Sequence, residues 1–359
     1  MSAVDGVRVR SGVAVTLLVL AFAVFPVPIW AGEDIDGERH ASPYETGSFR
    51  WTVGPPVLAA RSSTPEMTYY SIKDPSVVRF DDRWHIFCTV RGRPRTHQVE
   101  YLSLSDWQDP KPRREMLEII PGYYCAPQVF YFRPHKKWYL LYQTSDPQRK
   151  PALQPAISTN DRVDGVGKWS QPEFLFATGP NNVERWIDFW IICDDQRAYL
   201  FFTSLDGRFW RCETSLRDFP HGWNEPKVVL QTDIFEAAHV YSLKGRSQYL
   251  AIIEAQNGSR RYYKAFLADR LDDDWRPLAA ERNKPFLGPQ NVRFLGEEWC
   301  QSFSHGELLR DGYDERMEVN PDRLVMLFQG VSDREMAGKP YGEIPWKLGL
   351  AYQEVPAGP

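Results

Sequence analysis

The sequence has few cysteines and no strong charge of either sign. Its five cysteines are too scattered for a zinc site, and the odd number leaves at least one unpaired: Cys88, Cys125, Cys193, Cys212 and Cys300. Lys and Arg number 43 against 47 Asp and Glu, so the formal net charge is −4. A mildly acidic chain has no electrostatic reason to bind nucleic acid. We therefore expect neither a zinc site nor a nucleic-acid partner.

Long apolar runs are also scarce. One spans residues 13–30; Arg8 and Arg10 precede it, and a charged stretch follows it. This pattern predicts a secretory signal peptide over residues 1–31, followed by a flexible segment over 32–47. An uncleaved membrane anchor is the alternative, although Pro26 and Pro28 shorten its helical span. We therefore expect a secreted or periplasmic protein that has no membrane partner after cleavage.

Five tryptophans recur at near-regular spacing, and a proline follows each within four residues: Trp51, Trp107, Trp169, Trp223 and Trp275. An internal repeat of about 50 residues built from short strands is typical of a β-propeller. Because their period follows the repeat, we interpret these tryptophans as residues that pack the blades together.

Paired apolar runs lie between the tryptophans, and a polar turn joins the two members of each pair. The pairs are 75–80 with 84–90, 127–132 with 137–144, 189–193 with 197–204, 237–243 with 248–254, and 307–310 with 323–330. Five hairpins and five tryptophan elements predict an all-β, five-bladed propeller over residues 48–355. Trp51 precedes the first hairpin and none of the five follows the last, so the N-terminal strand is expected to close the final blade.

Acidic residues recur where the hairpins begin. The five matched positions hold Asp74, Ala126, Asp188, Glu236 and His305. In a propeller the first strand of each blade lines the central channel, so these side chains are expected to converge on one cavity. For any single residue, an aspartate that only caps its own turn is the commoner situation.

Converging carboxylates suit hydrolysis of a glycosidic bond, which needs one protonated acid and one ionised base. A third carboxylate keeps the acid protonated, because like charges held close together raise one pKa. Three acids on a propeller axis would also suit calcium. Lys73, beside Asp74, would either bind a sugar hydroxyl or pair with an acid.

Several blocks of the sequence resemble those of glycoside hydrolase family 62, over about residues 49–353. The most specific are Phe235-Glu236-Ala237-Ala238-His239-Val240-Tyr241 and Ser304-His305-Gly306-Glu307-Leu308-Leu309-Arg310. The blocks Ser71-Ile72-Lys73-Asp74, 127–132, 138–143, Ile187-Asp188 and Arg261-Tyr262-Tyr263 add to the likeness.

The resemblance implies a five-bladed α-L-arabinofuranosidase that removes arabinofuranosyl side chains from xylan with inversion. By the same resemblance, Asp74 matches the general base, Glu236 the general acid and Asp188 the residue that tunes the acid. His305 matches a ligand of a bound cation, usually calcium, whose shell is filled mostly by water. Tyr341 matches a tyrosine of the sugar pocket. We expect no organic cofactor, a polysaccharide partner and a monomer.

Some features depart from the family pattern. Thr144 follows Tyr142-Gln143 where a tryptophan is usual, and the segment 91–97 is rich in arginine. That segment would either bind an acidic glycan or form a solvated loop. Trp186 and Trp190, which lie near Asp188 in the sequence, are candidate sugar platforms.

Two other functions remain open at this point. One is a glycosidase of the family 43 type that acts on xylosides, arabinan or galactosides. The other is a carbohydrate-binding propeller without activity. The presence of all three acids argues against the second, because a pure binder needs no acid with a raised pKa.

Overall fold

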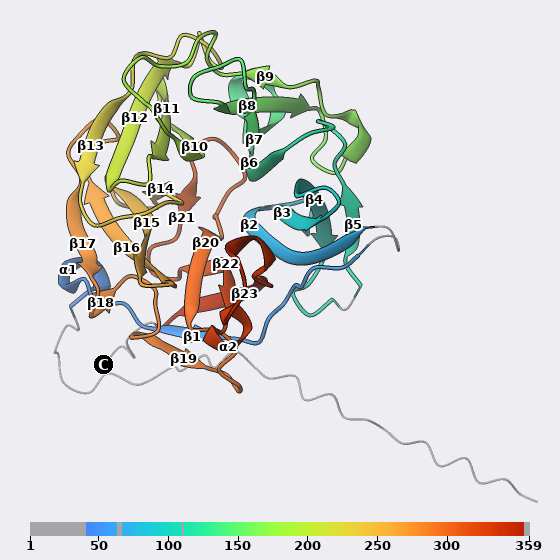
Figure 1. Ribbon diagram of the computed structural model, residues 1–359. Helices are drawn as coiled ribbons and strands as arrows, with labels where there is room; N and C mark the ends of the chain where they lie inside the picture. The colour runs from blue at the N-terminus through green and yellow to red at the C-terminus, as the bar shows by residue number, and fades with distance from the viewer. Residues whose placement is uncertain (1–40, 63–66, 110, 355–359) are drawn as a thin grey trace, which may run out of the picture. The chain divides into compact units, whose positions relative to one another are not determined.

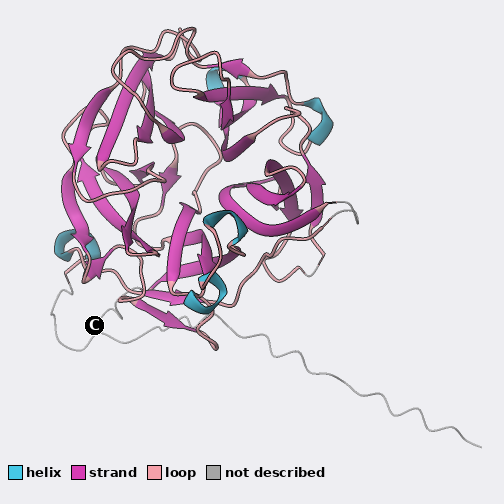
Figure 2. Ribbon diagram, viewed as in Figure 1, coloured by secondary structure: helices cyan, strands magenta, loops and turns pink. Residues whose placement is uncertain are grey.

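Five β-sheets surround a common axis in the computed structural model, which describes residues 41–62, 67–109 and 111–354 (Figure 1). In each sheet the strands follow one another outward from the axis, and the first long strands of the five blades are β2, β6, β10, β14 and β20, with the two-residue strand β21 inside β14. Helices are few and short (Figure 2). The prediction of an all-β, five-bladed propeller is confirmed.

The first three blades each contain four antiparallel strands in chain order. Blade I is β2 (Thr68–Phe80), β3 (Arg83–Arg93), β4 (His97–Leu104) and β5 (Arg113–Met116). Blade II is β6 (Tyr124–Phe132), β7 (Lys137–Ser145), β8 (Leu153–Asn160) and β9 (Glu173–Phe174). Blade III is β10 (Ile187–Cys193), β11 (Arg197–Thr203), β12 (Arg208–Ser215) and β13 (Lys227–Gln231).

The last two blades carry additional short strands. Blade IV is β14 (His239–Leu243), β15 (Tyr249–Asn257), β16 (Arg260–Ala268) and β17 (Arg276–Glu281), with β18 (Lys284–Pro285) outside and β21 (Glu318–Val319) inside. Blade V is β20 (Ser302–Leu308), β22 (Val325–Val331), β23 (Lys347–Gln353) and β1 (Trp51–Val53), with β19 (Val292–Phe294) at its edge. The short helices are α1 (Pro43–Thr46), η1 (Arg133–His135), η2 (Val166–Lys168), α2 (Asp333–Met336) and η3 (Tyr341–Glu343).

The N-terminal strand closes the ring, as predicted. Strand β1 pairs antiparallel with β23, and Trp51 lies opposite Gln353. The predicted signal peptide, 1–31, and residues 32–40 of the segment expected to be flexible lie outside the described residues. In the described remainder of that segment, Ser42 caps the short helix α1 and Tyr44 is buried.

The repeating tryptophans pack between strands, as expected from their period. Trp275, ahead of β17, contacts Phe201 and Phe209 of blade III. Trp169, ahead of β9, packs edge-on against Phe87 of blade I at 5.7 Å between ring centroids. Because these two rings reach the preceding blade, they join neighbouring sheets.

A connection between β20 and β22 crosses one end of the central channel. Its backbone carbonyls at Tyr313, Glu315 and Met317 accept hydrogen bonds from blades II, III and IV, respectively. Higher in the channel, Arg310 donates to the carbonyls of Val77 and Val129. This end is therefore filled by protein, and the opposite end, where the inner strands begin, remains for a site.

All five cysteines are buried and none forms a disulfide. Within the described ranges no helix has the length and apolar character needed to span a bilayer.

Candidate active site

The inner strands begin with a shared backbone distortion. Asp74, Ala126, Asp188 and Ala237 have φ values of 47°, 49°, 57° and 52°, in the left-handed region that residues other than glycine seldom adopt. The register of blades I to III shifts at the same points. Left-handed residues cost about 1 kcal/mol or more and persist where the surrounding structure requires them. Four of the five blades thus share this distortion, which falls on the matched position in blades I to III and one residue after Glu236 in blade IV.

Asp74 is held as an anion at the mouth of the channel. The Lys73 ammonium lies 3.3 Å from Asp74 Oδ1. The backbone N–H of Asp74 donates a hydrogen bond of 2.8 Å to Gln329 Oε1. Although burial alone would raise the pKa of Asp74, the Lys73 and His305 side chains and a hydrogen bond from Thr89 lower it to about 2. Asp74 is therefore ionised at any pH at which the protein would work.

His305 lies between two of the predicted carboxylates. Its Nδ1 is 3.4 Å from Asp74 Oδ1 and 3.6 Å from Asp188 Oδ2. The next residue, Gly306, lets β20 approach β22, since an added Cβ would lie 2.5 Å from the Leu327 carbonyl oxygen. The glycine in this block thus serves to place the histidine.

Glu236 and Asp188 have the opposite protonation tendency from Asp74. Burial, Glu254 and Asp188 together raise the pKa of Glu236 well above its ordinary range. Burial also raises the pKa of Asp188, with His305 opposing and Asp74 reinforcing the change. Asp188 Oδ2 accepts a hydrogen bond of 3.0 Å from the N–H of Ala237, directly after Glu236. The three acids therefore lie close together at the mouth of the channel.

Two charged residues of the site were missed by reasoning from the sequence. Arg261 lies 2.9 Å from Glu254 and 3.6 Å from Glu236. Glu254 also accepts hydrogen bonds from Ser304 Oγ and from the His305 N–H. The sequence did contain one signal: Glu254 directly follows the apolar run of β15. A buried carboxylate requires a partner, so this position indicated a charged neighbour.

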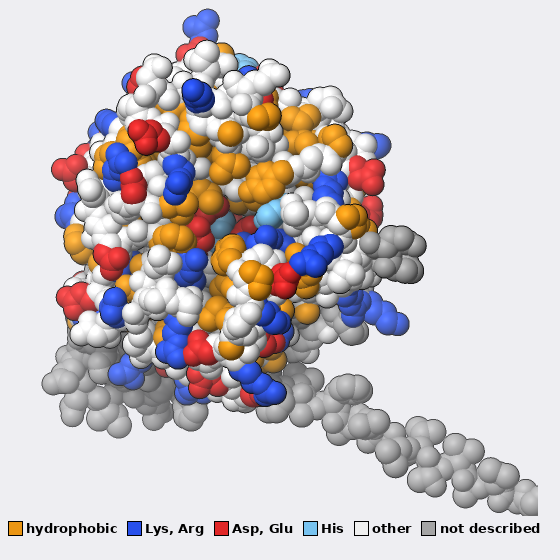
Figure 3. Space-filling view, viewed as in Figure 1, with side chains coloured by type: hydrophobic (Ala, Val, Ile, Leu, Met, Phe, Trp, Pro, Cys, Tyr) orange, Lys and Arg blue, Asp and Glu red, His pale blue; other side chains and the backbone are white. Residues whose placement is uncertain are grey.

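Tyr341 lies at the rim of the cavity, with 46% of its surface exposed. Its hydroxyl accepts a hydrogen bond of 3.3 Å from Lys73 Nζ. In the space-filling view, acidic and histidine side chains are visible at the bottom of a central hollow, with basic side chains beside it (Figure 3). The Lys73 ammonium thus contacts both Tyr341 and Asp74.

Trp186 and Trp190 are not available as sugar platforms. Trp186 has no exposed surface and packs against Phe176 and Phe202. Trp190 is 1% exposed, and its ring stacks on His239 at 4.1 Å. Both belong to the core around the site, because closeness in sequence to Asp188 does not determine the direction of a side chain.

The residues around His305 do not form a calcium site by themselves. Calcium takes about six to eight oxygen ligands. Across residues 41–62, 67–109 and 111–354, no group of three or more His, Cys, Asp or Glu side chains has the spacing of a metal site. Calcium bound by His305 stays a prediction.

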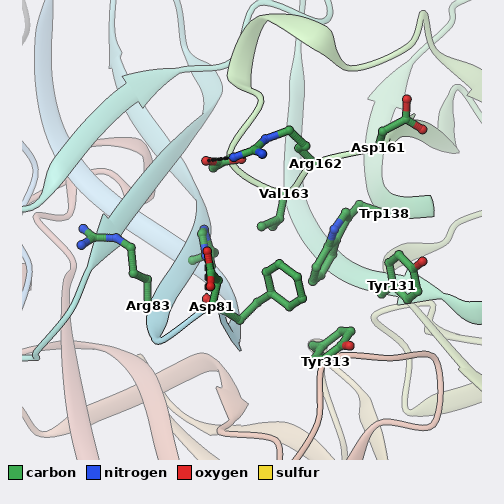
Figure 4. A pocket seen from close by; sticks show the side chains of 11 residues that line it. Asp81, Arg83, Tyr131, Trp138, Asp161, Arg162, Val163 and Tyr313 are labelled. Carbon is green, nitrogen blue, oxygen red and sulfur yellow. Dashed lines mark hydrogen bonds and ion pairs between the residues drawn. The ribbon is translucent and has the colours of Figure 1, made fainter. Parts of the chain in front are cut away.

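A second pocket, of about 400 Å³, lies at the other end of the inner strands, near the β2–β3 turn (Figure 4). Its charged groups are exposed or paired with one another, as in the double hydrogen bond from Arg162 to Asp164. It lacks the buried, mutually repelling carboxylates of the mouth. The candidate active site is therefore at the mouth alone.

The chain matches the sequence profile of glycosyl hydrolase family 62 over residues 51–352. It is 36% identical over 310 residues to α-L-arabinofuranosidase C of Cellvibrio japonicus (strain Ueda107). That alignment covers 84% of this chain but only 46% of the relative, so the chain spans about half of the relative's length.

Solved structures of the same family have the same fold. The catalytic domain of a Coprinopsis cinerea GH62 α-L-arabinofuranosidase superposes with a TM-score of 0.78 at 34% identity, covering 85% of this chain and 97% of that one. A GH62 hydrolase in complex with xylotriose gives a TM-score of 0.78 at 31% identity, covering 86% and 99%.

Proposed function

Because this chain belongs to glycosyl hydrolase family 62, we propose that it is an exo-acting α-L-arabinofuranosidase. The reaction would be inverting hydrolysis of arabinofuranosyl side chains on arabinoxylan or a related polysaccharide. The relatives named as α-L-arabinofuranosidases support the bond type, and the relative that binds xylotriose supports a xylan backbone.

One observation carries this proposal: the pKa values of two carboxylates in one cavity are pushed apart. That of Asp74 is lowered to about 2, and that of Glu236 is raised well above its ordinary range. Such a pair supplies an ionised base and a protonated acid at the same pH. A module that only binds sugar has no need of this difference.

In the proposed reaction, Asp74 accepts a proton from a water molecule that attacks the anomeric carbon of the arabinofuranosyl group. Glu236 donates its proton to the glycosidic oxygen on the opposite side. The bond from the anomeric carbon to the polymer oxygen breaks as the bond to water oxygen forms, which inverts the configuration. Lys73 and His305 hold Asp74 in its charged form.

Asp188 would act as a positioning residue for the acid. It accepts the hydrogen bond of Ala237, the residue after Glu236, and the two acids disfavour each other's ionisation, which raises the pKa of Glu236. Arg261 opposes that effect from the other side, 3.6 Å from Glu236 Oε1. These two neighbours would set the pH at which Glu236 is still protonated.

A groove lined by Arg261, which lies 3.6 Å from Glu236, suits the polymer that leaves. It has a volume of about 710 Å³ and runs between the β15–β16 turn and the segment 336–346, with Arg261 and Tyr341 in its lining. Since the general acid faces the leaving oxygen, the polysaccharide backbone would lie on this side. Export through the signal peptide at 1–31 completes the proposal, and N-terminal sequencing of the mature protein tests it.

The direct test is sugar analysis after incubation with arabinoxylan, arabinan and galactofuranose-containing glycans. We expect arabinose from arabinoxylan, with the product initially in the inverted anomeric form by NMR. Asp74→Asn and Glu236→Gln should each lower kcat by about 100-fold or more, because each removes a group that transfers a proton.

Asp81→Asn is a matched control. Asp81 lies at the far end of the same strand pair and also has a positive φ, of 50°. This variant should keep full activity. Binding of oligosaccharide without any hydrolysis would overturn the proposal in favour of a binding propeller, and release of xylose or galactose instead would favour activities of the family 43 type.

A further inference from the structure

The arginines of the 91–97 segment have different surroundings. Arg93 forms an ion pair with Glu343 of η3. Arg95 donates to the carbonyls of Ile120 and Gly122. Both side chains therefore fasten loops to one another, and neither has a guanidinium free to bind a ligand.

Arg91 is different, because within the described ranges its guanidinium has no partner, neither a carboxylate nor a carbonyl. Its guanidinium carbon lies 5.7 Å from the ring centroid of Tyr341. In the described parts of the chain the Arg91 side chain makes neither an ion pair nor a hydrogen bond, and its Nε is buried. Lys73 Nζ lies 5.3 Å from the centroid of the same ring. Tyr341 thus connects the ammonium that holds Asp74 to a second, unneutralised cation at the rim.

His97 adds an unused polar atom beside this cation. Its ring packs edge-on against Tyr123 at 4.8 Å, and its Nδ1 is buried without a partner. Burial, then Arg91, then Lys73 lower the pKa of His97 to about 4. His97 is therefore neutral near pH 6, and it offers a hydrogen bond without a charge.

An arginine that is partly desolvated beside another cation is favourable only when an anion completes the arrangement. The guanidinium fork matches a carboxylate, and charge-assisted hydrogen bonds of this kind are about twice as strong as neutral ones. The rim position places such an anion next to the sugar pocket, because Arg91 and Lys73 contact the same tyrosine.

We propose that Arg91, with His97 beside it, is a specificity-determining residue that binds the carboxylate of a uronic acid carried by the polysaccharide close to the scissile arabinofuranosyl group. This inference rests on the proposed function. It predicts that acidic arabinoxylan fragments are better substrates than neutral ones of the same length.

The test compares two substrates: an arabinosylated xylo-oligosaccharide, and the same oligosaccharide with glucuronic acid on a neighbouring xylose. We expect kcat/KM to be about 10-fold higher for the acidic substrate, and the preference to fall with added salt because it is electrostatic. Arg91→Met should abolish the preference and change the neutral rate by less than about threefold. Arg91→Lys should keep part of the preference, since it keeps the charge but loses the fork.

Arg93→Gln is the control, because it removes a charge from the same segment. Since it also frees Glu343 of η3, which contains Tyr341, the measure compared is the preference between the two substrates and not the absolute rate. Arg93→Gln should leave the preference unchanged. Equal kcat/KM for both substrates in the wild type, or a preference that persists in Arg91→Met, would overturn the inference. An equal loss on both substrates would also overturn it, because Arg91 would then only support Tyr341. Failure to hydrolyse the neutral substrate at all would instead count against the proposed function.

Discussion

The mouth of the channel and its middle both bury carboxylates on the inner strands, but they balance them differently. In the middle, Glu307 faces one cation, Arg310, at 2.7 Å, and both side chains are fully buried. At the mouth, Asp74, Asp188, Glu236 and Glu254 share two cations, Lys73 and Arg261. In the middle, Arg310 opposes the rise that burial gives to the pKa of Glu307. At the mouth, burial and the neighbouring acids Glu254 and Asp188 act together, and they raise the pKa of Glu236 well above its ordinary range.

The largest effect on stability is expected in the middle of the channel. Glu307→Gln leaves Arg310 buried without a counter-charge, which typically costs about 3–5 kcal/mol. Urea denaturation would measure the loss. The double variant Glu307→Gln/Arg310→Met removes both charges and should recover much of the stability. A single variant as stable as the wild type would show that the pair contributes little.

At the mouth, two isosteric substitutions should change stability in opposite directions. Asp74 has a lowered pKa, so its contribution is present above its ordinary value of 3.8 and is lost as the pH falls through about 2. Asp74→Asn should therefore destabilise the protein at pH 7, by about 2 kcal/mol. Glu236 has a raised pKa, so the wild type loses stability as the pH rises above the ordinary value of 4.5.

Glu236→Gln should therefore be more stable than the wild type at pH 7, with the advantage vanishing below pH 4.5. Thermal unfolding of both variants between pH 3 and 8 checks the two signs. If both variants lost stability at pH 7, removing a carboxylate would be destabilising at the mouth as it is in the middle of the channel. The proposed difference between the two regions would then be wrong.

The contrast also indicates how far the sequence alone leads. A repeat of about 50 residues predicted the ring, its closure by Trp51 and the convergence of Asp74, Asp188 and Glu236, because a repeated position implies a repeated direction. Glu254 and Arg261 could not be assigned in this way. Glu254 lies on β15 and Arg261 on β16, the second and third long strands of blade IV. Their role depends on the ion pair that they form across these two strands. Trp186 was wrong as a platform because the sequence does not reveal which face of a strand is covered.

The smallest effect on activity is expected from substitution of Thr89. Its variants distinguish a role in setting the pKa of Asp74 from a role in holding the backbone at the mouth. A hydrogen bond from its side chain to Asp74 helps to lower the pKa of that acid. The same hydroxyl accepts a hydrogen bond of 2.9 Å from the N–H of Ala126, one of the left-handed residues. Thr89→Val should therefore raise the pKa of Asp74 toward its ordinary value.

The acidic limb of the kcat/KM profile should then move upward, by less than about one pH unit, since one hydrogen bond is worth about 1 kcal/mol. Thr89→Ser keeps the hydroxyl and should leave the limb where it is. A loss of stability without any shift of the limb would mean that Thr89 supports only the backbone of Ala126. If the limb moved in Thr89→Val but not in Thr89→Ser, the hydroxyl itself would set the pKa of Asp74. The same hydroxyl would then both hold the backbone of Ala126 and tune the general base.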